Sequence, residues 1–227
     1  MTMGFIADGL FQSEEEIDRS PWISGSRPRV GGIKYKDLNG DGAITYDQDR
    51  AYIGRGQRPQ FNGSINLNAS WKGLEFDILF IGAAVCDVSL TGTYYNHNED
   101  NTIFTRPFKA GANSPRYLVE QAWTPENPDA KYPRLSLNPP NTNNAYASSF
   151  WYRDGKYLRL KSVHLGYTLP KAWTGKLRIQ KVKVYVEGNN LCTWSGLPEG
   201  IDPEWPGVTN GYYPQQRTVV GGLEISF

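Results

Sequence analysis

The sequence predicts an all-β protein, made of the antiparallel C-terminal strands of a transmembrane β-barrel with long extracellular loops and short periplasmic turns. Three observations support this fold class. Apolar and polar residues alternate in five segments, the pattern of strands with one apolar and one polar face. The connections between these segments are alternately short and long. Aromatic residues make up 13% of the 227 residues, as expected where aromatic belts flank a membrane.

The five predicted strands differ in sequence but share this alternation. The first strand alternates polar residues with Ile65 and Leu67, and the second alternates them with Phe76 and Ile78. Because successive side chains of a strand point to opposite faces, each segment has an apolar and a polar side. The five strands are expected at 64–71, 74–80, 163–168, 182–187 and 218–227.

Connection lengths favour a barrel over a soluble sandwich, which also shows alternation. Residues 72–73 and 170–177 form short links, whereas 87–153 and 193–217 are long. If the last strand runs toward the periplasm, every short link lies on the periplasmic side and every long one outside, as in outer-membrane barrels. The alternative is a secreted, soluble β-sandwich module that binds carbohydrate and holds a structural Ca²⁺.

Composition excludes several other classes. The net charge of +1 does not suggest nucleic acid as a partner. No window holds eighteen apolar residues, so no transmembrane helix is predicted. Residues 1–20 lack the basic start of a signal peptide, so either the protein is not exported or Met1 lies inside a longer reading frame. Cys86 and Cys192 are expected on non-neighbouring strands, too far apart for a disulfide.

Residues 37–49 match an oxygen-rich Ca²⁺ loop. Gly42 permits its sharp turn and Ile44 anchors it. Gln48 stands where a carboxylate is usual, so a flanking aspartate would have to close the cage. The alternative is an Asx-rich turn held by local hydrogen bonds. The expected role is structural, and the candidate ligands are Asp37, Asn39, Asp41, the Ala43 carbonyl, Thr45, Asp47 and Asp49.

Aromatic residues in the long connections and at strand ends are candidates for stacking on a ligand. For each, the alternative is an aromatic-belt or loop-packing role. The candidates are Tyr94, Tyr95, Trp123, Trp151, Trp194, Trp205 and Tyr212.

No catalytic residue is assigned, and the protein is not expected to be an enzyme. Only His97 and His164 are present, and neither accompanies a nucleophile and carboxylate in an interpretable context. Glu75 and Asp77 share one strand face, but alternate polar residues on a strand are usually its wet side.

Six segments in series resemble the SusC/RagA-like TonB-dependent outer-membrane transporters, and Phe227 matches the terminal aromatic residue common in such barrels. The order and spacing agree over nearly the whole chain, apart from one extra residue in the calcium-like loop. The segments are GFIADGLFQSEEEID, IKYKDLNGDGAIT with DRAYIG, WTPENPDAKYPRL, FWYRDGKYLRLKSVHLGYTLP, VEGNNLCTWSGLPEGIDPEW and YYPQQRTVVGGLEISF.

The resemblance implies a larger barrel in the outer membrane, with a plug domain and TonB box that these residues do not include. It implies import of oligosaccharides or peptides, energised by the TonB complex, with a SusD-like surface lipoprotein as partner. Residues 1–60 would form an extracellular loop region, and 61–227 the last strands and loops. Without a plug, this segment alone is not expected to transport.

Overall fold

The computed structural model divides into two compact units. Unit 1 combines residues 1–57, 87–153 and 206–212, and unit 2 combines 58–86, 154–205 and 213–227. The structure describes residues 2–90, 116–136, 143–175, 179–205 and 215–227.

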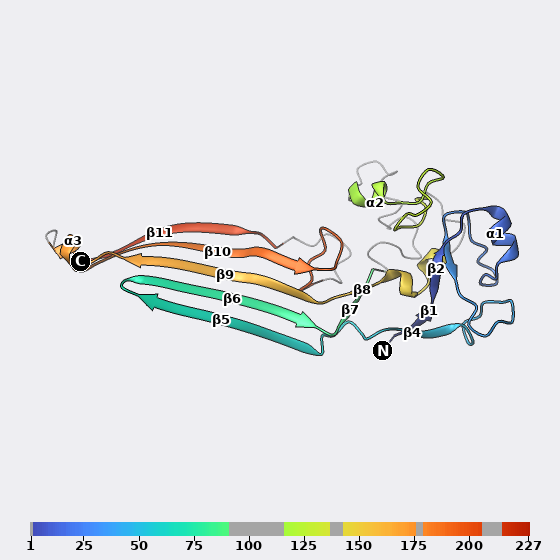
Figure 1. The fold of residues 1–227 in the computed structure, drawn as a ribbon, viewed down its shortest axis with the longest axis horizontal. Coiled ribbons are helices and arrows are strands. Elements are labelled where there is room, and N and C mark those ends of the chain that lie inside the picture. The colour runs from blue at the N-terminus through green and yellow to red at the C-terminus, as the bar shows by residue number, and fades with distance from the viewer. Residues whose placement is uncertain (1, 91–115, 137–142, 176–178, 206–214) are drawn as a thin grey trace. The chain divides into compact units, whose positions relative to one another are not determined.

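Unit 2 is built on one antiparallel sheet with the strand order β11-β10-β9-β6-β5 (Figure 1). The five predicted strands are confirmed, each reaching beyond its alternating segment at one end or both, except the last, which ends one residue early. Their bounds are β5 Phe61–Trp71, β6 Leu74–Ala84, β9 Tyr157–Thr168, β10 Lys181–Ser195 and β11 Thr218–Ser226.

The hairpin between β5 and β6 is as tight as predicted. Lys72 and Gly73 both have positive φ angles, 48° and 89°, which a two-residue hairpin turn of the right twist requires. Gly73 also lies against β9, because its carbonyl accepts the Thr168 amide at 2.8 Å and a Cβ would come within 2.6 Å of the Thr168 carbonyl oxygen. A larger residue would therefore separate the turn from its neighbour.

The short connections lie at one end of this sheet. The Lys72–Gly73 turn and the short helix α3, Lys171–Thr174, are at the same end as the close of β11 (Figure 1). The connections that follow β6 and β10 leave from the opposite end and are long. The predicted alternation of short and long links is therefore seen in the structure.

Unit 1 has a conventional hydrophobic core and only short elements, none of which the alternation predicted. Three two-stranded sheets pair β1 with β4, β2 with β3, and β7 with β8. Their bounds are β1 Thr2–Phe5, β2 Ala7–Leu10, β3 Ile33–Tyr35, β4 Arg50–Gly54, β7 Asp87–Ser89 and β8 Tyr152–Asp154. The helices are α1 Glu14–Arg19, α2 Arg116–Glu120, η3 Asn143–Ala145 and η4 Ser149–Trp151.

Helix α1 shows why this region folds locally. The Ser13 side chain accepts the Glu16 amide at 3.2 Å, and Glu16 in turn accepts the Gln12 amide at 2.8 Å. The Ser13 bond satisfies an amide that the first turn leaves free, and the Glu16 bond fixes the residue before the cap. The helix then buries Ile17 completely. The largest fully buried side chains of the described residues all belong to unit 1: Trp151, Phe5, Phe11, Ile17, Ile33, Ile44, Leu90 and Leu118.

Cys86 and Cys192 are not joined by a disulfide. Cys86 is buried just beyond β6 and Cys192 is exposed on β10, and β9 lies between those strands. Among the helices that the structure describes, none has the length and apolar character needed to span a membrane.

Candidate functional site

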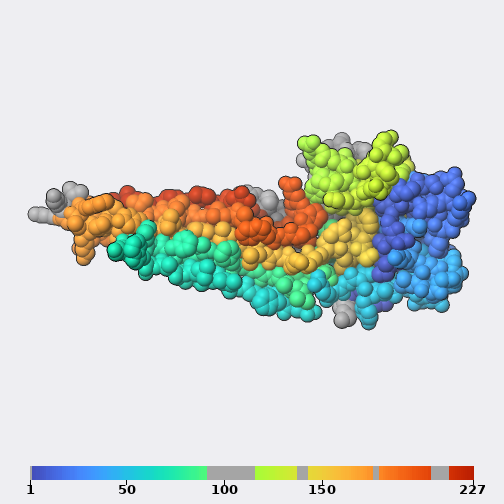
Figure 2. All heavy atoms as spheres, viewed as in Figure 1, coloured from blue at the N-terminus to red at the C-terminus, as the bar shows by residue number. Residues whose placement is uncertain are grey.

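The large sheet has one apolar face that runs across all five strands. Pairing registers place Ala69, Phe76, Leu165, Val186 and Gly221 in a single row, one residue from each strand. The apolar side chains are exposed rather than buried, with Leu67 at 52% and Leu223 at 61%. Figure 2 shows the side chains of β5 and β6 (teal) at the surface along both strands. Such a face is suited to a hydrocarbon environment.

The opposite face carries polar and charged side chains. One row runs from Asn68 through Asp77 and His164 to Glu187, so an imidazole lies between two carboxylate positions. The His164 ring stacks on Tyr185, with the ring centroids 5.4 Å apart. In this row the chemistry of the two faces therefore differs.

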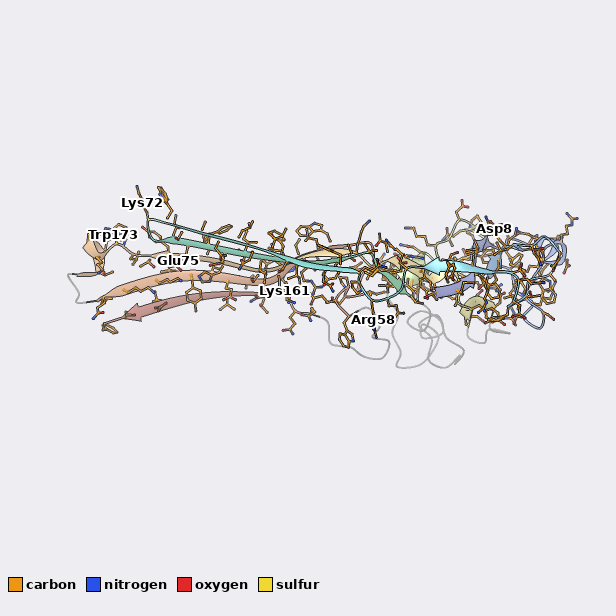
Figure 3. The ribbon with its side chains drawn as sticks, turned by 90° about the horizontal axis from the view of Figure 1, so that it is seen from below. Asp8, Arg58, Lys72, Glu75, Lys161 and Trp173 are labelled. Carbon is orange, nitrogen blue, oxygen red and sulfur yellow. The ribbon has the colours of Figure 1, made fainter. Side chains whose placement is uncertain are left out.

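An ion pair crosses this polar face near the short-turn end. Lys183 on β10 donates to Glu75 on β6, although β9 lies between those strands. Gly166 of β9 makes the crossing possible, because a Cβ there would be 2.7 Å from Lys183 Cε. Figure 3 shows Glu75 toward the Lys72 end of the sheet and Lys161 farther along it.

A larger charged group occupies the polar face nearer the long connections. We call Arg159, Lys161, Asp202 and Glu204 the Arg159 cluster. The Arg159 guanidinium donates to Asp202 at 2.8 Å and to Glu204, and its Nε donates to Thr193 Oγ1 at 2.8 Å. Lys161 contacts both Glu204 oxygens at 3.2 Å. The Arg159 and Asp202 side chains are only 4% exposed.

A β-bulge in β9 brings Arg159 to the polar face of the sheet. Leu79 pairs with Ser162 but Phe80 pairs with Leu160, so Lys161 is an extra residue in the ladder. An extra residue shifts the alternation by one. With strict alternation Arg159 would lie on the apolar face with Val163 and Leu165. The bulge instead places it on the polar face opposite Ile81, while Leu160 lies on the apolar face opposite Phe80.

The calcium-like loop in unit 1 is organised by its own hydrogen bonds. The Asp37 carboxylate accepts the amides of Gly40 and Gly42 at 2.7 and 2.8 Å, and Asp41 accepts the Ala43 amide at 2.9 Å. Ile44 is buried, as its anchoring role requires. Within the described residues, no group of three or more His, Cys, Asp or Glu side chains is already arranged to hold a metal ion.

Two aspartates that flank Gln48 have different surroundings. Asp47 is exposed, whereas Asp49 is fully buried and accepts the amides of Leu38 and Thr45, each at 2.8 Å. Burial acts to raise the pKa of Asp49, but these hydrogen bonds outweigh it and hold that pKa below its ordinary value. Asp49 thus closes the loop as an ionised backbone acceptor, and Asp47 stays available at the surface.

Similarity to curated proteins extends over nearly the whole chain. It is 33% identical over 242 aligned residues to TonB-dependent receptor P26 of Formosa agariphila, and the match covers 96% of this chain. It is 30% identical to TonB-dependent receptor P3 of the same organism, over 99% of the chain. The homologues of this chain are TonB-dependent receptors. The chain spans 22% of the length of each of these two relatives. No family model matches it.

Solved structures confirm the predicted fold of this chain. The chain is 24% identical to the RagAB peptide importer in its open-open state, with a TM-score of 0.58, and 23% identical to a second RagAB peptide transporter structure, with a TM-score of 0.61. Each match covers 99% of this chain and 22% of the other. The antiparallel strands of a β-barrel and the resemblance to the SusC/RagA type are both confirmed.

The candidate aromatic residues that the structure describes lie in different environments. Trp123 and Trp151 are buried in unit 1, where their indole N–H groups donate to Gln12 Oε1 at 2.9 Å and to the Asn144 carbonyl at 2.7 Å. They pack the loop region, which is the alternative that the sequence left open for each. Tyr94, Tyr95 and Tyr212 lie outside the described residues.

The other two tryptophans are exposed. Trp194 on β10 pairs with Leu158 on the apolar face and is 52% exposed, a position that suits an aromatic belt. Trp205 is 68% exposed and directly follows Glu204 of the Arg159 cluster. Among the candidates that the structure describes, Trp205 is therefore the one next to the charged cluster on the polar face.

The Arg159 cluster is not apparent from the sequence. Its basic residues stand on a strand, where alternate polar residues only indicate a wet face, and its carboxylates lie more than forty residues later. The available signal was that the basic and the acidic residues each fall in a segment that resembles the TonB-dependent transporter family.

Proposed function

We propose that this chain forms part of the wall and the external loops of an outer-membrane TonB-dependent transporter that imports oligosaccharides or peptides. The observation that carries the proposal is the apolar face aligned in register across five strands and exposed to its surroundings. In a bilayer this face contacts lipid, and the polar face lines the interior of the barrel.

The orientation follows from the connections. The short links 72–73 and 169–180 lie on the periplasmic side, and the long ones lie outside the cell. Residues 1–60, with the calcium-like loop, then belong to the extracellular loop region, and 61–227 supply the last strands and loops. Energy from the TonB complex acts through a plug outside these residues, and a SusD-like lipoprotein covers the outer opening, in keeping with the likeness to the RagAB importer.

A soluble β-sandwich module is the less favoured function. A sandwich buries the apolar face of each sheet against a second one. In unit 2, β5 is exposed along its entire length and large apolar residues of all five strands remain accessible.

The test uses the natural protein in its own host. Cell fractionation is expected to place it in the outer membrane, and deletion of its gene is expected to abolish growth on one class of oligomer, peptide or oligosaccharide, while growth on the corresponding monomers continues. Monomers pass through general porins and serve as the control. Recovery of the protein from the soluble periplasm, or unchanged growth on every oligomer tested, would contradict the transporter.

We also propose that residues 37–49 hold a structural Ca²⁺. The donors Asp37, Asn39, Asp41 and the Ala43 carbonyl lie in one exposed turn, with Asp47 as the flanking carboxylate that remains accessible. Because the loop already closes through its own hydrogen bonds, bound Ca²⁺ would rigidify it rather than fold it.

Calcium at about a hundredfold above its dissociation constant is expected to stabilise unit 1 by roughly 2.7 kcal/mol. The measurement is thermal unfolding with Ca²⁺ and after chelation. The double variant Asp37→Asn, Asp41→Asn should lose the calcium response, and Asp129→Asn, an exposed carboxylate elsewhere in unit 1, should keep it. If the double variant kept the calcium response, the ion would bind outside this loop.

A further inference from the structure

The segment that follows β10 forms a compact turn of its own at Asp202–Trp205. The Trp205 amide donates to the Asp202 carbonyl at 3.1 Å, and the Glu204 amide donates to Asp202 Oδ1 at 2.8 Å. Asp at the first and Pro at the second position favour such a turn, because the side chain accepts a local amide and the ring presets φ. The turn therefore has a defined shape.

This turn is tied to β9 by charge. Asp202 Oδ1 accepts from the turn amide and from Arg159 Nη2, so one oxygen both shapes the turn and attaches it. Glu204 accepts from Arg159 and from Lys161. Since the Arg159 and Asp202 side chains are 4% exposed, neither charge can be left alone without a large desolvation cost.

The basic residues of the Arg159 cluster are held by the sheet. Arg159 pairs with Ile81 on β6 and with Thr193 on β10, and its Nε is held by the Thr193 hydroxyl. Two strands therefore orient the guanidinium independently of its contacts with the turn. A fork-shaped donor held in this way fixes direction as well as distance.

We propose that Arg159 and Lys161 are positioning residues that lock the Asp202–Trp205 turn on the polar wall and so present the Trp205 indole to the solute path. This rests on the proposed transport function, which makes the polar face the inner one. The indole is 68% exposed and its backbone amide is bonded within the locked turn. A pre-organised aromatic platform loses little entropy when it binds. Its ligands are flat apolar surfaces, such as a sugar ring face or an aromatic side chain.

Hydrogen exchange of the natural protein in detergent or lipid tests the lock without any need for transport. In Arg159→Gln, exchange of the amides in residues 200–205 is expected to rise on the order of tenfold to a hundredfold, because a buried ion pair loses one partner and the turn opens locally. Peptides from residues 61–84 should remain protected and report that the sheet is intact.

If Arg159→Gln disturbs the sheet, variants within the turn test the lock instead. Asp202→Asn and Glu204→Gln change only the turn and are expected to raise the same exchange rates, whereas Glu199→Gln, an exposed carboxylate outside the cluster, should not. The double variant Arg159→Gln, Asp202→Asn should exchange no faster than Arg159→Gln alone, because the two residues act through each other. Unchanged exchange in the turn variants would overturn the lock.

The ligand role has a separate readout. In uptake assays Trp205→Ala and Asp202→Asn should each raise the half-saturating concentration several-fold with little change in the maximal rate, and Trp205→Phe should restore much of the loss. An unchanged half-saturating concentration in Trp205→Ala would overturn the presentation of the indole. If the natural protein imports nothing, the transport proposal fails, and the exchange rates still decide whether the turn is locked.

Discussion

Replacing Leu67 with arginine is expected to prevent stable assembly of the protein in the outer membrane. Leu67 lies at the middle of β5 on the apolar face, opposite Ile78, and its side chain is 52% exposed. A charged side chain at the centre of a lipid-facing strand costs about 2–4 kcal/mol. This is a large part of the free energy of unfolding of an ordinary domain.

The adjacent residue provides a matched control. Asn68 is also exposed on β5 but lies on the polar face, opposite Asp77. Asn68→Arg adds the same charge one position along the strand, next to a carboxylate, and should leave the yield in the membrane nearly unchanged. The measurement is the amount of heat-modifiable protein in purified outer membranes. Equal yields of the two variants would show that the apolar face does not contact lipid.

Replacing Trp151 with alanine is expected to destabilise unit 1 by about 3–5 kcal/mol, the usual cost of removing a buried tryptophan. Trp151 is fully buried, and its ring meets Phe150 edge to face at 5.0 Å. Its indole N–H also satisfies the Asn144 carbonyl at 2.7 Å, which the variant would leave without that donor. The loop region should therefore unfold well before the sheet.

Limited proteolysis and hydrogen exchange of unit 1 measure this effect in the natural protein. Trp173→Ala is the matched control, because Trp173 on α3 is 66% exposed and its removal leaves no cavity. If both variants resisted protease equally, Trp151 would not be a packing residue of the loop region.

The large sheet was predictable because its physics is local. A strand between lipid and water must alternate, so each strand is visible as a period of two in its own residues. The ends of the strands were harder to predict from the sequence. Residues such as Gly63, Gly82 and Ala83 continue β5 and β6 without clear alternation, and only pairing with the neighbouring strand shows that they belong to the sheet.

Unit 1 was not predictable in the same way. Its strands have three to five residues, too few to establish a period, and they pair over long sequence distances, as Thr2 does with Gly54. The same difficulty applies to the tryptophans. A tryptophan in a long connection can stack on a ligand or pack a core, and the burial of Trp123 and Trp151 depends on contacts with Gln12 and Asn144 that composition does not reveal.

By itself, the sequence determined that this chain is all-β, that five strands have two chemically different faces, and that short and long connections alternate, since each property is written in neighbouring residues. Only the tertiary structure decided which side chains contact one another across the sheet. The Arg159 cluster joins a strand to a turn more than forty residues away, and its position depends on one extra residue in β9. Contacts of this kind follow from strand register, which pairing in three dimensions sets.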